Sequence, residues 1–156
     1  MIRFKALLKS LLKTNPNILK LRLRDLSKDL RQIPELQFDF YIERENKIDL
    51  QITSCYEQDL EIHNSEISQQ ELVVLFIYFN NTLGNHKSNH EMFLNSSLKD
   101  KYKLYQATKN GNSKIYSRLY YKRDFENLKR AIDRSLTEIF YYNSKTLITV
   151  RYVKHE

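Results

Sequence analysis

The sequence contains little glycine, proline and alanine. Two of its 156 residues are Gly, two are Pro and three are Ala, although Gly alone makes up about 7% of an average protein. A P-loop or a dinucleotide-binding fingerprint needs two or three clustered glycines, and Gly84 and Gly111 lie far apart in the chain. The sequence therefore excludes these phosphate-binding motifs, together with collagen-like, Gly/Ser-rich and Pro-rich segments.

Cysteine and long apolar runs are scarce as well. Cys55 is the single cysteine, so no disulfide can form within the chain, and we expect an intracellular, reducing compartment such as the cytoplasm or an organelle matrix. The longest wholly apolar run is Leu72–Phe79, which is far shorter than the roughly 20 residues of a membrane span. A length of 156 residues is typical of one domain.

Phe, Tyr, Ile, Asn and Lys are abundant, and their A/T-rich codons suggest genome bias rather than function. The distribution of charge is more informative than the lysine content. Residues 1–31 carry nine Lys/Arg and two acidic residues, and residues 101–156 carry thirteen Lys/Arg and five acidic residues. By contrast, residues 32–71 carry two Lys/Arg and ten acidic residues. The basic and acidic segments either neutralise each other in the fold or form separate patches for different partners.

The basic N-terminal segment, residues 1–31, has helical periodicity. Apolar residues recur at helical spacing over residues 2–13. Residues 17–32 fit both a strand and a helix, and their length favours a helix that ends before Pro34.

Residues 32–64 are expected to form an acidic β-hairpin, because even-numbered apolar residues alternate with polar ones over 36–42 and 48–52. We expect Ile42 to pair with Ile48 and Phe40 with Leu50 across a three-residue loop, 44–46. A two-residue loop would place Ile48 opposite Glu43 and disrupt the apolar face. The polar face of this hairpin carries Asp39, Glu43, Glu45 and Asp49.

The middle of the chain is predicted to contain a buried helix. Ser68 and Glu71 have the spacing of a capping box, which favours a helix over 69–82, within the segment 65–84, with Gly84 at its C-terminal end. Because this helix would be apolar on all sides, we expect it at the centre of the fold. Residues 85–100 are polar and are expected to form a loop.

The last segment, 101–156, is predicted as hairpin, helix and strand. Asn110-Gly111 is a strong signal for a two-residue hairpin turn. Asp124 is placed to cap a helix with one apolar stripe, and Leu147–Val153 reads as a strand. The predicted order is αα-ββ-α-ββ-α-β, a single α+β domain with a mostly antiparallel sheet packed on the central apolar helix.

The second hairpin supplies the candidate site. A two-residue turn would place Tyr105 opposite Tyr116 on a face that carries cations and tyrosines, and the following residues would extend that face. The candidate nucleic-acid-binding residues are Lys101, Lys103, Tyr105, Lys109, Lys114, Tyr116, Arg118, Tyr120, Lys122, Arg123 and Arg130. Single strands are bound in this way, with cations on phosphates and bases stacked on aromatic rings. A solvated sheet face with a Tyr–Tyr pair is the alternative.

The leading hypothesis is a small, basic, non-enzymatic protein that contacts RNA or single-stranded DNA, as a component of a larger nucleoprotein assembly. The alternative is an inhibitor or adaptor of viral or mobile-element type. It would act on a host nucleic-acid enzyme through Asp39, Glu43, Glu45 and Asp49. No catalytic signature is recognised, since Glu45-Asn46-Lys47 falls in a predicted turn and His86 and His90 lack further ligands. We therefore expect no enzyme activity, no cofactor and no metal.

Overall fold

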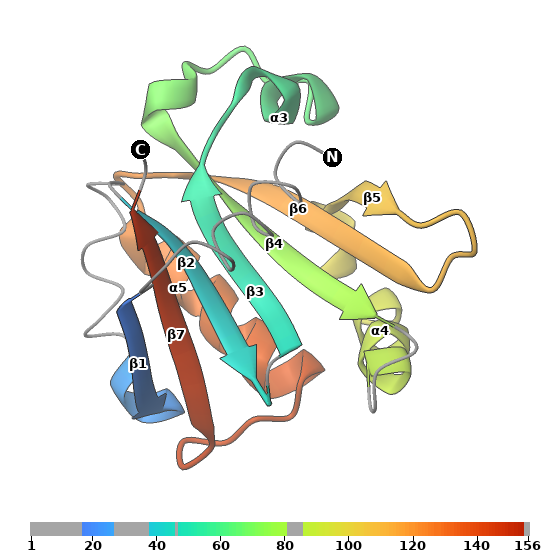
Figure 1. The fold of residues 1–156 in the computed structure, drawn as a ribbon. Coiled ribbons are helices and arrows are strands. Elements are labelled where there is room, and N and C mark those ends of the chain that lie inside the picture. Colours follow the sequence, from blue (N-terminus) through green and yellow to red (C-terminus); the bar gives the residue numbers. More distant parts are fainter. Residues whose placement is uncertain (1–16, 27–37, 46, 81–85, 155–156) are drawn as a thin grey trace.

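The computed structural model describes residues 17–26, 38–45, 47–80 and 86–154, and the helix predicted over 2–13 lies outside these ranges. The described residues form one seven-stranded antiparallel sheet and three helices, so the predicted α+β class is confirmed (Figure 1). The strand order is β1-β7-β2-β3-β4-β6-β5.

The strands are β1 (Asn17–Arg22), β2 (Phe38–Arg44), β3 (Lys47–Ser54), β4 (Leu72–Asn80), β5 (Lys103–Ala107), β6 (Ser113–Tyr121) and β7 (Leu147–Lys154). The helices are α3 (Glu57–Ile62), α4 (His86–Leu94) and α5 (Phe125–Arg134), and α5 continues into a π-helical turn, Ser135–Ile139. Short 3-10 turns lie at Leu23–Asp25, Gln69–Glu71 and Lys99–Lys101.

The apolar run at the centre of the sequence is strand β4, and the prediction of a central helix over 69–82 is wrong. β4 lies inside the sheet between β3 and β6, and both of its faces are buried, which explains why its residues are apolar without alternation. The Ser68 side chain makes no capping hydrogen bond, and only a 3-10 turn precedes the strand. The helix predicted over 17–32 is also wrong where it is described, since β1 occupies residues 17–22.

One face of the sheet packs against α4 and α5 to form the main core. In Figure 1, α5 lies behind the strands. Its residues Leu128 and Ile132 are buried in the main core, together with Leu136 of the π-helical turn that follows. Asp124 caps α5 as predicted, because its carboxylate accepts a hydrogen bond from the backbone N–H of Asn127 at 3.3 Å. Helix α4 replaces the predicted polar loop and contributes the buried Phe93 to the same core.

The opposite face carries a smaller apolar cluster and a polar network. Phe76, Val74 and Ile115 form the cluster with Cys55 and Leu72, and Leu60 of α3 packs against it. Further along β2 and β3, the buried Gln51 amide donates to the Tyr41 hydroxyl at 3.2 Å and accepts from the Tyr78 hydroxyl. These polar groups on the buried face are therefore paired with one another.

The β2–β3 hairpin contains a β-bulge that sets the register of its two strands. Its turn has two residues, with Arg44 opposite Lys47 and with Glu45 in the left-handed region at φ 52°. Ile42 pairs with Leu50 and not with Ile48, so the predicted register and the three-residue loop are wrong. Because the pairing shifts between Ile42 and Glu43, Asp49 is an extra residue, and this bulge returns Leu50 to the buried face.

Candidate nucleic-acid interface

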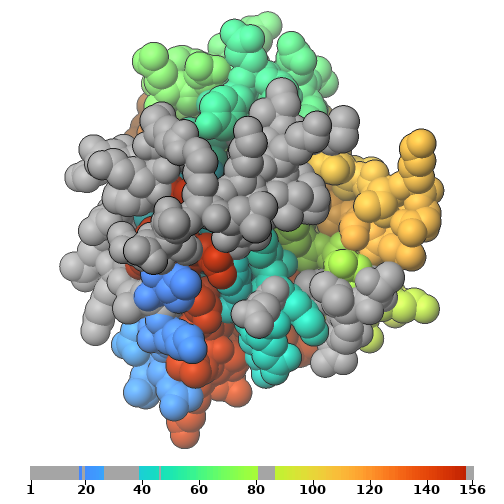
Figure 2. All heavy atoms as spheres, in the orientation of Figure 1, coloured from blue at the N-terminus to red at the C-terminus, as the bar shows by residue number. Residues whose placement is uncertain are grey.

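The second hairpin carries a strong concentration of positive charge. From residue 101 to residue 123 the sequence holds seven Lys/Arg and no acidic residue. All seven are exposed or partly exposed: Lys101, Lys103, Lys109, Lys114, Arg118, Lys122 and Arg123. The β5–β6 hairpin projects from the side of the molecule, where Figures 1 and 2 show it in yellow and orange. Lys103, Lys109 and Lys114 belong to this projecting hairpin, whereas Lys122 and Arg123 follow the C-terminal end of β6.

The hairpin departs from the predicted register at Tyr105. Next to the turn, Ala107 pairs with Lys114 and Gln106 with Ile115, as predicted. A bulge at Tyr105 then shifts the pairing, so that Leu104 lies opposite Tyr116. The predicted Tyr105–Tyr116 pair is therefore wrong, and the two rings lie on opposite faces of the sheet.

The tyrosines of the predicted stacking surface are packed inside the protein. Tyr116 is 8% exposed and Tyr120 is 3% exposed, and both belong to the core beneath the helices. The Tyr116 hydroxyl lies 2.8 Å from His90 Nε2, and its ring is centred 4.7 Å from that of Phe93. Burial raises the pKa of both tyrosines. Neither ring offers the open surface on which a base could stack.

Tyr105 is also held by the fold, on the other face. Its ring meets Phe76 edge-on with the centroids 4.9 Å apart, and its hydroxyl accepts a hydrogen bond from Gln58 Nε2 at 2.7 Å. The predicted stacking platform of three tyrosines is thus not formed, and Leu104 is an exposed large apolar side chain of β5.

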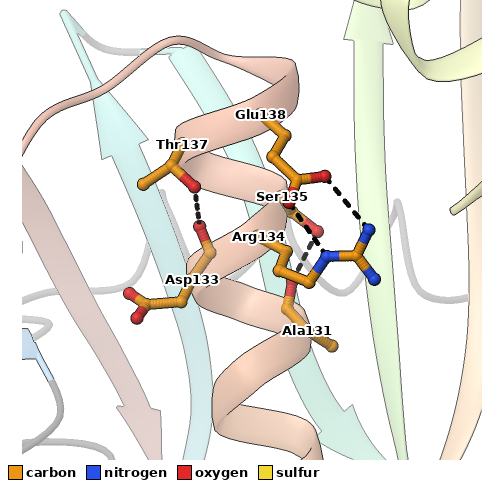
Figure 3. Close-up of polar contacts among 6 residues, drawn as sticks. All are labelled: Ala131, Asp133, Arg134, Ser135, Thr137 and Glu138. Carbon is orange, nitrogen blue, oxygen red and sulfur yellow. Dashed lines mark hydrogen bonds and ion pairs between the residues drawn. The ribbon is translucent and has the colours of Figure 1, made fainter. Parts of the chain in front are cut away.

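Two of the cations are oriented by aromatic neighbours. The Arg118 guanidinium lies 4.6 Å from the centre of the Tyr120 ring, and that of Arg123 lies 4.6 Å from the Tyr121 ring. Arg130 is exposed on α5. By contrast, Arg134 forms two hydrogen bonds with Glu138, at 3.0 and 3.1 Å, beside the Ser135 and Thr137 hydroxyls that bond back to the helix (Figure 3). Its charge is therefore neutralised locally.

His90, one of the two histidines of α4, is a structural residue. His90 is buried, stacks on Phe79 with the ring centroids 4.8 Å apart, and bonds to Tyr116. Burial lowers the pKa of His90, Lys114 lowers it further, and Glu91 opposes the shift. His90 therefore lies in the core and not in the polar loop that the sequence predicts over 85–100.

The acidic hairpin does not present the predicted acidic surface. Glu43 is buried and forms an ion pair with Arg151 at 2.9 Å. Asp49 is fully buried at the bulge and accepts a hydrogen bond from the Tyr142 hydroxyl. Asp39 is partly exposed and Glu45 is exposed. Half of the predicted acidic residues therefore serve the fold and cannot contact a partner directly.

Hollows at two ends of the sheet were not foreseen from the sequence. One, of about 550 Å³, is lined by Arg118, Leu119, Lys101 and residues 63–67. Another, of about 430 Å³, lies at the β2–β3 turn and is lined by Arg44, Glu45, Lys47, Asp49, Ser88, Asn89, Phe140, Tyr141 and Tyr142. The available signal was that Arg44 and Lys47 are the two cations of the acidic segment 32–71 and flank its turn.

Comparisons with protein-family models, curated proteins and solved structures find no match to this chain. In the described parts of the chain, no helix is long and apolar enough to span a membrane. Nor do three or more His, Cys, Asp or Glu side chains gather there as they would around a metal ion.

Proposed function

We propose that the chain is a non-enzymatic protein that binds RNA or single-stranded DNA through phosphate contacts of the β5–β6 hairpin, within a larger nucleoprotein assembly. The observation that carries the proposal is the run of seven solvent-accessible cations without an acidic residue between 101 and 123. Phosphate contacts by Lys and Arg supply most of the affinity in non-specific nucleic-acid binding.

The burial of the tyrosines changes the mode of binding that we propose. With Tyr116 and Tyr120 in the core, base stacking on these rings is not part of the interaction. Contacts to phosphates fix position but carry no direct sequence information. The proposal is therefore for weakly selective binding that depends strongly on salt.

The test is the binding of a labelled uridine oligonucleotide at a series of salt concentrations. For single strands the slope of log K against log salt is about −0.7 per phosphate contact. Replacing Lys103, Lys109 and Lys114 by Gln should reduce its magnitude by about 2 if each contacts one phosphate. Binding that is absent at low salt, or a slope that the triple variant leaves unchanged, would contradict the proposal.

Matched controls separate charge from fold. Arg134→Gln removes a cation that is already paired with Glu138, so it should leave the slope unchanged. Tyr116→Phe keeps the buried ring and removes the hydroxyl that bonds to His90; it should lower stability without altering the affinity of the folded protein. If Tyr105→Leu, which removes an aromatic ring, weakened binding in the folded state, base stacking would have to be restored to the mechanism.

The binding of a protein partner is the second candidate function, and one observation at the end of β6 favours it. β6 has nine residues, but its pairing with β5 covers Lys114–Ser117. Among the described strands, none pairs with Arg118–Tyr121 on that side, where the hollow at Lys101 and Arg118 lies. An unpaired edge accepts an added strand. Amide hydrogen exchange at residues 118–121 that slows when an extended acidic peptide is added would support this role.

A further inference from the structure

We propose a nucleotide-binding site in the hollow between the β2–β3 turn, the first turn of α4 and residues 140–142. The ligand class is a nucleoside phosphate, either free or as a unit of a single strand. This site is separate from the hairpin surface. Its volume of about 430 Å³ lies within the range of roughly 300–1,000 Å³ typical of small-molecule sites.

Positive charge converges on this hollow from several elements. Arg44 and Lys47 lie at the two ends of the β2–β3 turn. A second hollow of about 570 Å³ shares Arg44 and Glu45 with the first, and it is also lined by Lys20 and Lys145. The first hollow is itself lined by two cations and two carboxylates, Glu45 and Asp49, and Asp49 is fully buried. Lys20 and Lys145 belong to the second hollow, so a phosphate would meet most positive charge on the side of Arg44, which the two hollows share.

A chain of contacts connects Arg44 to the core. The bulge buries Asp49, whose carboxylate accepts a hydrogen bond from Tyr142. The Arg44 guanidinium lies 4.8 Å from the centre of the Tyr142 ring. A guanidinium held in place by an aromatic ring presents its planar fork of N–H donors with little loss of freedom, and this geometry matches a phosphate.

Asn89 adds a polar group to the wall of the hollow. The residue is 7% exposed and lines the hollow. An amide can both donate to and accept from the edge of a base. The first turn of α4, which carries Ser88 and Asn89, contains no acidic residue, and the positive end of its dipole also favours an anion.

Tyr141 provides a ring for the base. It is 61% exposed and has φ 58°, in the left-handed region that a bulky residue rarely adopts. Backbone strain of this kind concentrates at ligand-binding sites. Tyr141 lines the hollow next to Tyr142, so an exposed aromatic face lies beside the phosphate-binding cations. We infer that the phosphate binds Arg44 and Lys47. The base then packs against Tyr141, and its edge faces Asn89.

The test is calorimetric titration of the full chain with AMP, adenosine and inorganic phosphate at one ionic strength. AMP should bind saturably, and adenosine and phosphate should each bind about tenfold more weakly or worse, because each makes part of the contacts. Arg44→Gln should weaken the binding of AMP by about tenfold and change the affinity for adenosine little. Tyr141→Ala should weaken the binding of both AMP and adenosine. Lys99→Gln, at an exposed position in the 3-10 turn before β5, is the matched control and should change neither affinity.

The two sources of ligand are distinguished by competition. If AMP displaces a labelled uridine oligonucleotide from the triple hairpin variant, the site holds a unit of a single strand, and if it does not, the site holds a free nucleotide. No saturable AMP binding would overturn the proposal. So would unchanged affinity in the Arg44→Gln and Asn89→Leu variants, once thermal unfolding has shown that both are folded. AMP binding that disappears in the hairpin variant and persists in Arg44→Gln would assign the nucleotide to the hairpin instead.

Discussion

The contact between Tyr142 and Asp49 makes the stability of the protein depend on alkaline pH in a specific way. Tyr142 is largely buried, and its hydroxyl donates to the fully buried Asp49 carboxylate. Tyr142→Phe keeps the ring under Arg44 and removes the donor. A buried acceptor that loses its partner destabilises a protein by about 1–3 kcal/mol. At neutral pH we therefore expect the variant to be less stable than the wild type by about 2 kcal/mol.

The difference should shrink at high pH. Burial raises the pKa of Tyr142 well above its ordinary value of 10.0, and the charge of Asp49 raises it further. Above pH 10 the unfolded chain loses this proton while the folded chain keeps it. The contribution of Tyr142 is thus complete below pH 10 and falls by about 1.4 kcal/mol per pH unit above it. Phenylalanine has no such proton, so the two proteins should become equally stable about 1.5 units above pH 10, where the loss matches about 2 kcal/mol.

Urea unfolding of both proteins at a series of pH values measures this effect directly. Tyr141→Phe is the matched control, because that neighbouring side chain is mostly exposed, and it should change the free energy of unfolding by less than about 0.5 kcal/mol at neutral pH. A difference between wild type and Tyr142→Phe that stays constant from pH 7 to pH 11 would refute the reasoning. So would a variant as stable as the wild type at neutral pH.

Further predictions concern the turn, the cap and the core, and urea unfolding measures each. Gly111 has φ 72°, and a Cβ atom at this position would meet no other atom within 4 Å. Gly111→Ala should therefore destabilise the protein by about 1–2 kcal/mol through backbone strain alone. Gly111→Asn should destabilise it less. Asp124→Ala removes the cap of α5 and should cost about 1 kcal/mol; an unchanged midpoint would show that the cap is not used. Phe93→Ala leaves a cavity under β4 and should cost about 3–5 kcal/mol, whereas a loss below about 1 kcal/mol would mean that α4 is loosely packed.

The fold class followed from the sequence, but the central element did not. The stripe on α5 was predictable because the apolar residues of a half-buried helix recur with a period near 3.6 residues. The cap was predictable because Asp is a preferred N-cap residue and Asp124 directly precedes that stripe. Leu72–Phe79 is buried on both faces, so it has no period with which to distinguish a strand from a helix. Its β-branched and aromatic composition favoured a strand, and the Ser68–Glu71 spacing, which imitates a capping box, outweighed that signal.

The candidate site was mispredicted for two physical reasons: β-bulges changed the register of both hairpins, and Tyr116 and Tyr120 lie on a face that is buried in the main core. A single extra residue reverses which face every later side chain occupies, and no feature of the sequence alone marks where it falls. The bulge at Tyr105 separates that ring from Tyr116, which removes the predicted stacking pair and leaves the hairpin with its cations. The bulge at Asp49 buries a carboxylate that alternation had placed in solvent. That buried carboxylate accepts a hydrogen bond from Tyr142, and the Arg44 guanidinium lies over the Tyr142 ring. The bulge that buries Asp49 therefore also supports the arginine for which we propose phosphate binding.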